Sequence, residues 1–428
     1  MGTAPFPLSF GSGMRHVIIG SGPAGVVAAE TLRRLDPSAE ITVIGDKTGF
    51  AQSTVRTASR SRGALDETPN CARSDADHLA RLRIELRHSR VKAIDTAACS
   101  VTLADGRVVP YDRALIATGS RPVRPAIVGI DLPQVFTCWT PADAQAIAAV
   151  VSPAAHVLQM GAGFIGCIAM QALAAHTARL TVVEVRERML AHLLDDVAGG
   201  LIRRWCEDQG VRICTGRRVV AVTRSGERLR AEIDDGEIIE ADVLINATGG
   251  QPNVAFLAGS GIALDRGVLV DAAMQSSVAG VYAAGDAAEA IETGTRRRRV
   301  NAIQPDAVEQ ARIAALNMAG HPALLPGTFA YNILDTLGLV SASFGQWQEG
   351  AGGETAQLLE AADYRYLRLV FSGDRLLGAN SVGYTEQIAA LRGLIQERVS
   401  LGEWKQRLSA APLQVTEAYL ARRLLATD

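Results

Sequence analysis

Two glycine patterns contain the residues whose types and spacing are best suited to chemistry. The first, Gly20-Ser21-Gly22-Pro23-Ala24-Gly25, follows the apolar run 17–19 and opens a segment rich in alanine and leucine. A second apolar run, 41–44, leads into Asp46. In such a βαβ unit the first glycine allows a tight turn, the second lets the backbone approach a pyrophosphate, and the third lets helix and strand pack closely. The pattern therefore predicts a dinucleotide site rather than an ordinary glycine turn.

The same pattern occurs a second time. Gly161-Ala162-Gly163-Phe164-Ile165-Gly166 follows an apolar run that begins at His156, and the strand after the next helical segment ends at Glu184. In both units the helix start would offer free N–H groups and a partial positive charge to phosphates. Two units imply two dinucleotides, and a chain that binds both is most simply explained as passing electrons between them.

Further motifs place these units in two similar domains. The stretch 111–122 contains a strand that ends in Ala117-Thr118-Gly119, and 241–253 contains one that ends in Ala247-Thr248-Gly249. This repeat suggests that the second domain is inserted into the first. The strand in 277–286 ends in Gly285-Asp286, where a carboxylate could accept hydrogen bonds from sugar or ribityl hydroxyls. A helix over 305–318 should begin near the ligand of Asp286.

Other segments are less specific. We expect a short amphipathic helix over 75–86 and a small antiparallel sheet within 211–240. The arginine run 296–299 is either a solvated loop or a surface for an acidic partner. From about residue 327 the pattern changes to strands followed by helices over 385–398, 401–410 and 414–425. These segments indicate a separate α+β domain.

Composition limits the classes of function. The chain has 428 residues, 48% of them hydrophobic, and a net charge of −2, which gives no reason to expect nucleic acid or an anionic membrane as partner. No apolar run approaches a membrane span, and the N-terminal residues lack the features of a secretory signal. The six cysteines are scattered without CxxC spacing. We therefore expect a cytoplasmic protein with neither a disulfide framework nor a metal site.

As a set, these motifs resemble those of the pyridine nucleotide-disulfide oxidoreductases, in the branch of NADH-dependent ferredoxin, rubredoxin and nitrite reductases. The resemblance runs from about residue 15 to 425. It implies an α/β fold with two Rossmann-like domains, one inserted in the other, and a C-terminal α+β interface domain that covers the flavin or mediates dimers. The expected domains are an FAD-binding domain over 14–123 and 250–326, an NAD(P)H-binding domain over 124–249, and the interface domain over 327–428.

The resemblance also assigns roles to residues. FAD would be bound by the first glycine pattern, with Asp46 on its adenosine ribose, Thr118 and Gly119 beside its nucleotide, and Asp286 on a ribityl hydroxyl. NADH would be bound by the second pattern, with Glu184 on its ribose. Glu184 would repel a 2′-phosphate, so NADPH is less favoured than NADH. NADPH stays an alternative because Arg186 and Arg188 lie just beyond Glu184. The full set of expected cofactor-binding residues is Gly20, Gly22, Pro23, Ala24, Gly25, Asp46, Val91, Ala117, Thr118, Gly119, Arg121, Gly161, Gly163, Phe164, Ile165, Gly166, Glu184, Gly249, Gly285 and Asp286.

The sequence also departs from the family pattern. Residues 47–75 contain one cysteine, Cys71, which excludes two-cysteine disulfide chemistry. The lysine with which many relatives reach the flavin is missing from this loop, and Ile168 replaces the glutamate that usually partners it. Loss of both charges together makes physical sense, because one charge buried alone is costly. Hydride transfer either works without the pair, or uses an arginine such as Arg60 instead, or the site has another role. Gln304 stands where relatives often have an aromatic residue.

The leading hypothesis is an FAD enzyme that takes hydride from NADH and passes electrons to an iron–sulfur protein or a small acceptor. Its catalysis would rest on positioning, so we assign no catalytic acid or base. The alternative is a degenerate flavoprotein subunit that acts as scaffold or regulator in a hetero-oligomeric complex. A flavin monooxygenase or amine oxidase is disfavoured, because we find no segment that supplies a dedicated substrate cavity. The sequence does not identify the acceptor or the oligomeric state.

Overall fold

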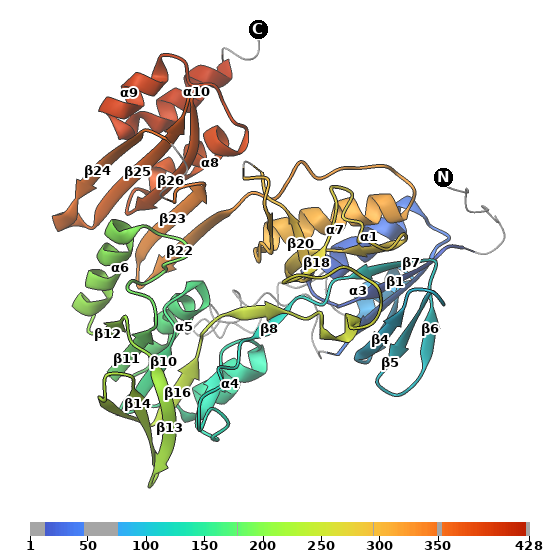
Figure 1. The fold of residues 1–428 in the computed structure, drawn as a ribbon, viewed down its shortest axis with the longest axis horizontal. Coiled ribbons are helices and arrows are strands. Elements are labelled where there is room, and N and C mark those ends of the chain that lie inside the picture. Colours follow the sequence, from blue (N-terminus) through green and yellow to red (C-terminus); the bar gives the residue numbers. More distant parts are fainter. Residues whose placement is uncertain (1–12, 47–75, 178, 294, 349–352, 425–428) are drawn as a thin grey trace. The chain divides into compact units, whose positions relative to one another are not determined.

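The computed structural model describes residues 13–46, 76–177, 179–293, 295–348 and 353–424 (Figure 1). These residues form two compact units. The first contains the described residues up to 121 together with 252–328, and the second contains 122–251 together with those from 329 onward. The chain crosses between the units within β8 (Ser120–Pro122) and β17 (Gly250–Pro252), and again after Thr328. Residues 122–251 are thus inserted in the first unit, whereas the C-terminal strands and helices follow it in the chain and belong to the second unit.

The first unit is built on a parallel sheet in the order β19-β7-β1-β2-β3. Helices α1 and α7 pack side by side (Figure 1). One core contains side chains of this sheet and of both helices. The elements of the first unit are β1 (Arg15–Ile19), α1 (Pro23–Leu35), β2 (Glu40–Gly45), α3 (Ala76–Arg81), β3 (Glu85–His88), β4 (Val91–Asp95), β5 (Ser100–Leu103), β6 (Val108–Pro110), β7 (Arg113–Ile116), η1 (Ala255–Leu257), β18 (Val268–Leu269), β19 (Val281–Ala283), η2 (Gly285–Ala287), β20 (Ala288–Ile291), β21 (Arg298–Arg299) and α7 (Gln304–Met318).

The second unit repeats this plan with a parallel sheet in the order β12-β11-β10-β16-β9. The expected small antiparallel sheet is present as β13-β14-β15. The elements are β9 (Val135–Thr137), α4 (Pro141–Val150), β10 (His156–Met160), α5 (Phe164–Ala174), β11 (Arg179–Glu184), α6 (Asp196–Asp208), β12 (Arg212–Thr215), β13 (Val219–Ser225), β14 (Arg228–Ile233), β15 (Ile238–Ala241) and β16 (Val243–Asn246).

The C-terminal part of this unit is an antiparallel sheet in the order β22-β23-β26-β25-β24, which shares a core with α8, α9 and α10. Side chains of β22, β23, β25 and β26 also enter a core with α5 and α6. The elements are β22 (Tyr331–Thr336), β23 (Leu339–Gly345), β24 (Thr355–Glu360), η3 (Ala361–Asp363), β25 (Arg365–Ser372), β26 (Arg375–Val382), η4 (Thr385–Gln387), α8 (Ile388–Gln396), α9 (Trp404–Ala410), η5 (Pro412–Gln414) and α10 (Val415–Leu424). The fold is thus the predicted one: two parallel sheets of Rossmann type and a C-terminal α+β part. No described helix is long and apolar enough to cross a membrane.

The expectation of a helix over 75–86 is wrong in its second half. Helix α3 ends at Arg81, Arg83 takes a positive φ of 53°, and residues 85–88 form β3. The backbone of β3 pairs with β2, for example Leu86 with Val43. The long-range ladder of a parallel sheet thus outweighs the local helical pattern, since propensity is a weak prior that tertiary context overrides.

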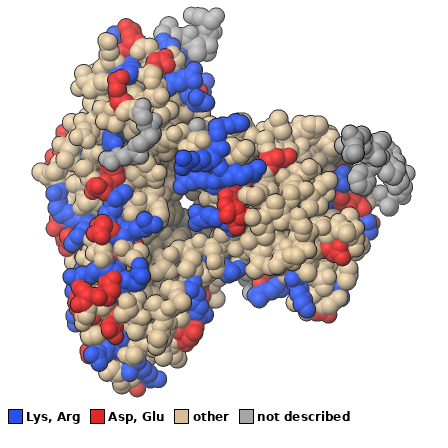
Figure 2. All heavy atoms as spheres, in the orientation of Figure 1, with Lys and Arg blue, Asp and Glu red and all other residues tan. Residues whose placement is uncertain are grey.

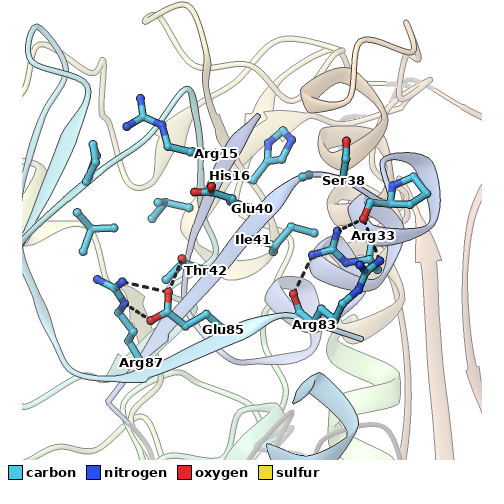
Figure 3. Close-up of a pocket in the computed structure, with 15 residues that line it drawn as sticks. Arg15, His16, Arg33, Ser38, Glu40, Ile41, Thr42, Arg83, Glu85 and Arg87 are labelled. Atoms are coloured by element: carbon cyan, nitrogen blue, oxygen red, sulfur yellow. Dashed lines mark hydrogen bonds and ion pairs between the residues drawn. The ribbon is translucent and has the colours of Figure 1, made fainter. Parts of the chain in front are cut away.

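A pocket of about 450 Å³ lies in the first unit, near the starts of β1 and β2 (Figure 3). Its lining includes Arg15, His16 and Glu40, whereas the first glycine pattern follows the other end of β1. The pocket is therefore distinct from the expected dinucleotide site. The His16 ring is buried, with 1% of its surface exposed, and neither ring nitrogen has a hydrogen-bond partner among the described residues.

We expect His16 to make the protein sensitive to acid. Burial lowers the pKa of His16 from 6.5 to about 4, so below pH 6.5 the unfolded chain takes up a proton that the folded chain does not. The free energy of unfolding therefore keeps its full value above pH 6.5, the pKa in the unfolded chain, and falls as the pH drops toward 4. At pH 5 the loss is about 2 kcal/mol. Urea unfolding at pH 7 and pH 5 should show that wild type loses about this much more than His16→Gln. Equal losses in both proteins would contradict the assignment.

Candidate dinucleotide-binding sites

The two glycine loops have the same geometry, which follows from the strand–turn–helix order of each unit. Gly20 and Gly161 both have positive φ, 121° and 99°. The Gly20 N–H donates to the Ile44 carbonyl at 2.7 Å, and the Gly161 N–H donates to the Val183 carbonyl at 2.8 Å. Each loop is therefore fixed to the strand that follows its helix, in a conformation that glycine adopts without strain.

The first and third glycines of each pattern are required by packing within the protein. A Cβ on Gly20 would lie 2.0 Å from the Ala117 carbonyl oxygen, and one on Gly161 would lie 2.4 Å from that of Ala247. A Cβ on the third glycine, Gly25 or Gly166, would lie 1.9 or 2.3 Å from the carbonyl oxygen of the first. The alanine of each Ala-Thr-Gly stretch thus meets the first glycine of its unit directly.

The second glycine of each pattern differs. A Cβ added to Gly22 or Gly163 would meet no atom of the described residues within 4 Å. Both are the N-cap residues of their helices, and neither α1 nor α5 has a side-chain cap. The start of each helix therefore lacks a side-chain cap and has room beside it, which suits a pyrophosphate. The residues present fit the dinucleotides that the sequence predicts.

Glu184 lies at the end of β11 with 8% of its surface exposed. One carboxylate oxygen accepts from the Ala162 N–H at 2.7 Å, and the other accepts from the Arg186 N–H at 2.8 Å. A carboxylate offers about four lone-pair directions, so two remain for ribose hydroxyls. Glu184 therefore also holds the second glycine loop in place, a role that the sequence did not indicate.

Asp46 is placed differently in the first unit. Its carboxylate is exposed at the end of β2 and accepts from the Arg90 guanidinium at 3.0 Å. Exposed ion pairs of this kind contribute little to stability. Val91, which directly follows Arg90 in the chain, is buried in β4, and its backbone pairs with that of Leu103. Asp46 and Val91 therefore lie close to each other through Arg90, while their roles toward FAD remain predictions.

Asp286 lies in η2, where burial raises the pKa of its carboxyl group. The Ser120 hydroxyl donates to it at 2.5 Å. Helix α7 lies beside this site, since the Gly285 N–H donates to the buried Gln310 side chain at 2.8 Å. A Cβ on Gly285 would also lie 3.4 Å from the Cβ of Ala307, in the first turn of α7. The first turn of α7 is thus close to Gly285, while the expectation that the helix begins near the ligand of Asp286 stays a prediction. Ser120 and Gln310 were missed in the sequence, where a lone serine or glutamine gives no signal.

The Ala117-Thr118-Gly119 stretch is held by Asn253. The Thr118 hydroxyl donates to the Asn253 carbonyl at 2.7 Å, and the Asn253 amide donates to the Thr118 carbonyl at 3.1 Å. Arg121 donates to the same side chain at 3.4 Å. Gly249 ends the matching stretch with a φ of 111°. Both stretches end in a positive-φ glycine, since Gly119 has a φ of 65°.

The residues at which the sequence departs from the family pattern lie in different parts of the fold. Ile168 is buried in the core around α5, where it packs with apolar side chains. Gln304 is the exposed first residue of α7. Cys71, Arg60 and the rest of 47–75 lie outside the described residues. Of the other five cysteines, four are buried and only Cys99 is exposed.

The repeated nucleotide-binding plan defines a two-dinucleotide oxidoreductase. The family model of pyridine nucleotide-disulphide oxidoreductases matches residues 14–311, and the chain belongs to this family of NAD(P)H-dependent flavin enzymes. It is 31% identical over 406 residues to the NADH-dependent phenylglyoxylate dehydrogenase subunit epsilon of Aromatoleum evansii, covering 94% of this chain and 96% of that relative. It is 28% identical to the rhodocoxin reductase of Rhodococcus erythropolis, covering 91% of each.

The fold matches solved structures of the same class. The reductase in the covalent putidaredoxin reductase–putidaredoxin complex aligns with a TM-score of 0.86 at 22% identity, covering 96% of this chain and 100% of that one. At this identity the likeness concerns the fold. It includes the C-terminal part, which the family model does not reach.

Proposed function

We propose that this protein is an FAD-dependent NADH:acceptor oxidoreductase, which takes hydride from NADH and passes electrons to an iron–sulfur protein or a small acceptor. The observation that carries this proposal is the pair of glycine loops with open space at Gly22 and Gly163. FAD, when bound, would supply the redox chemistry. The protein would bind and orient two dinucleotides, which is the main requirement for hydride transfer.

The residues around Asp286 support binding of FAD in the first unit. The half-buried carboxylate keeps lone pairs beyond its bond to Ser120, so it can accept from a ligand hydroxyl. Helix α7 begins beside it without a side-chain cap. The partial positive charge at this helix start would stabilise negative charge on a reduced flavin.

Glu184 supports NADH as the preferred donor. We expect Glu184→Ala to lower kcat/KM for NADH by about 10- to 100-fold, since hydrogen bonds to a charged group contribute about 1.5–3 kcal/mol. NADPH should lose less, because the repulsion of its 2′-phosphate disappears together with the carboxylate. Steady-state kinetics with both cofactors would measure the ratio, with Glu187→Ala, an exposed glutamate of the same loop, as control. An equal loss for NADH and NADPH would argue against this role.

A second candidate is a subunit whose place is in a hetero-oligomeric complex. The relative from Aromatoleum evansii is named as a subunit of an NADH-dependent dehydrogenase. Ile168, buried where relatives carry a glutamate, agrees with altered chemistry at the flavin. Within such a complex the chain would act as scaffold or as an electron-input subunit.

Charges of both signs are mixed on the surface that an acceptor would meet. Figure 2 shows basic and acidic side chains interspersed over the visible face. The exposed run 296–299 lies partly in β21, but Arg299 pairs with Glu292 at 3.2 Å and Arg298 donates to the Glu289 carbonyl at 3.5 Å. Part of its charge therefore serves internal contacts. An acidic partner for this run is one option within the proposed function.

The deciding experiment is anaerobic stopped-flow absorbance of the flavin band after mixing with NADH and, separately, with NADPH. Rapid bleaching with NADH, and slower bleaching with NADPH, would support the oxidoreductase. Bound flavin that stays oxidised would exclude NADH turnover by the isolated chain and favour the scaffold. A protein without flavin would overturn both forms of the proposal.

A further inference from the structure

The segment 185–195 connects Glu184 to helix α6. Its beginning is fixed by the second glycine loop, because Glu184 accepts from the N–H groups of both Ala162 and Arg186. The Leu190 N–H donates to the Ala162 carbonyl at 2.9 Å, which ties the middle of the segment to the same loop. If Glu184 meets the ribose of NADH, as proposed above, the shape of this segment determines what surrounds that ribose.

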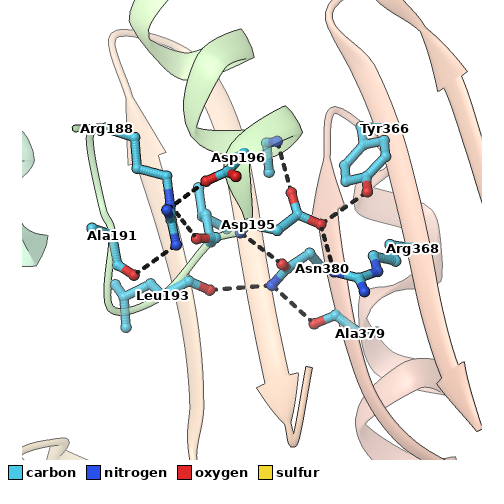
Figure 4. Close-up of polar contacts among 11 residues, drawn as sticks. Arg188, Ala191, Leu193, Asp195, Asp196, Tyr366, Arg368, Ala379 and Asn380 are labelled. Atoms are coloured by element: carbon cyan, nitrogen blue, oxygen red, sulfur yellow. Dashed lines mark hydrogen bonds and ion pairs between the residues drawn. The ribbon is translucent and has the colours of Figure 1, made fainter. Parts of the chain in front are cut away.

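The end of the segment is bound by the C-terminal sheet through Asn380 of β26 (Figure 4). The Asn380 side-chain oxygen accepts from the Asp195 N–H at 3.0 Å, and its nitrogen donates to the Leu193 carbonyl at 3.1 Å. Asn380 is fully buried. One amide side chain thus satisfies two backbone groups of the segment in a place where water does not reach, and buried groups left unpaired are costly.

Asp195 makes further contacts between the end of this segment and the C-terminal sheet. Its carboxylate caps α6 by accepting from the Ala198 N–H at 2.9 Å, and it also accepts from the Tyr366 hydroxyl at 2.9 Å and from Arg368 at 3.3 Å. Burial and the neighbouring carboxylate raise the pKa of Tyr366, so its hydroxyl stays protonated as a donor. Two strands of the C-terminal sheet, β25 and β26, therefore hold the end of the segment.

Apolar packing joins the same parts. Met189, Leu190 and Leu194 are buried in one core with Tyr366 and Val382 of the C-terminal sheet. Leu190 also adopts a positive φ of 53°, which is unfavourable for a side chain of this size. Such a conformation persists only when its surroundings hold it. The conformation of the segment 185–195 is therefore held by its packing against the C-terminal sheet.

We propose that Asn380 is a positioning residue for NADH binding, which acts by holding the segment 185–195 so that Glu184 and Arg186 can meet the cofactor's ribose. The proposal rests on the function proposed above and extends it. It gives the C-terminal sheet a part in cofactor affinity, in addition to any part in assembly. It also places a determinant of NADH affinity far along the chain from the fingerprint.

The test is steady-state kinetics of the FAD-loaded protein with NADH and ferricyanide. Asn380→Ala should raise KM for NADH about 5- to 20-fold, as expected for the loss of one to two hydrogen bonds, with kcat within about twofold of wild type. Tyr366→Phe removes only the hydroxyl bond to Asp195 and should raise KM about two- to fivefold. The matched control is Ser381→Ala, because the buried Ser381 hydroxyl donates to the Tyr384 carbonyl and stays within the C-terminal part.

A second readout keeps the outcomes distinct. Calorimetric titration with NAD⁺ should show a Kd that rises by the same factor as KM in each variant. An unchanged KM and Kd in folded Asn380→Ala would overturn the proposal, as would a fall in thermal stability with unchanged affinity. If Asn380→Ala does not fold, Tyr366→Phe carries the test with the same criteria. If wild type binds NAD⁺ but does not oxidise NADH, the proposed function fails, while the titrations still decide the role of Asn380.

Discussion

Gly163→Val is expected to give a folded, yellow protein that NADH no longer reduces. A Cβ at this position would meet no atom within 4 Å in the part of the chain that the structure describes, so we expect the fold to accommodate the substitution. It would instead fill the space in front of the uncapped start of α5, where the pyrophosphate is expected to accept from N–H groups. Losing two charge-assisted hydrogen bonds costs about 3–6 kcal/mol, which lowers kcat/KM for NADH by about 100-fold or more.

Stopped-flow reduction and the thermal melting curve would check this together. The control is Gly200→Val, because Gly200 is also open to a Cβ but lies on the exposed side of α6. Gly166→Ala gives the opposite contrast, since its Cβ would lie 2.3 Å from the Gly161 carbonyl oxygen and should disturb folding. Normal reduction of Gly163→Val by NADH would mean that the second loop does not bind the pyrophosphate.

The matching change in the first unit, Gly22→Val, should give a protein that is purified without FAD. Gly22 is the N-cap residue of α1, which has no side-chain cap, and a Cβ added there would meet no described atom within 4 Å. We expect FAD affinity to fall by about 100-fold or more. Because bound ligand itself stabilises a protein, the variant must be compared with wild type stripped of FAD, and the two should melt within about 2 °C.

The measurement is the ratio of flavin to protein absorbance, followed by titration of the colourless variant with FAD. Gly25→Ala should behave differently, since a Cβ there would lie 1.9 Å from the Gly20 carbonyl oxygen and the fold itself would have to shift. Retention of stoichiometric FAD by Gly22→Val would refute the assignment of the first loop.

The sequence predicted what depends on local chemistry. The glycine patterns, the acids at strand ends and the helix beside Asp286 are each determined by a few adjacent residues, and their local geometry agrees with the prediction. The helix over 75–86 failed because β3 is stabilised by pairing with β2 rather than by its own pattern. Helices α4 and α6 and strand β22 were not identified in the sequence.

The contacts that complete the sites were beyond prediction for the same reason. Ser120 reaches Asp286 and Asn380 reaches Asp195 across long stretches of chain, and neither serine nor asparagine has a spacing that marks it. The double role of Glu184 was also hidden, because its hydrogen bonds to Ala162 and Arg186 depend on how the loop closes. Such residues become apparent only when the fold brings distant segments together.

The contact between the first glycine and the Ala-Thr-Gly alanine has a consequence for recognising distant members of this family. Gly20 lies against the main-chain carbonyl of Ala117, and Gly161 lies against that of Ala247. A larger residue at either glycine would force the two strands apart. The alanine side chains take no part in these contacts, so the contacts place no limit on the residue type at 117 or 247. A search profile for distant relatives should therefore weight the first glycine of each loop more heavily than the alanine of the matching stretch.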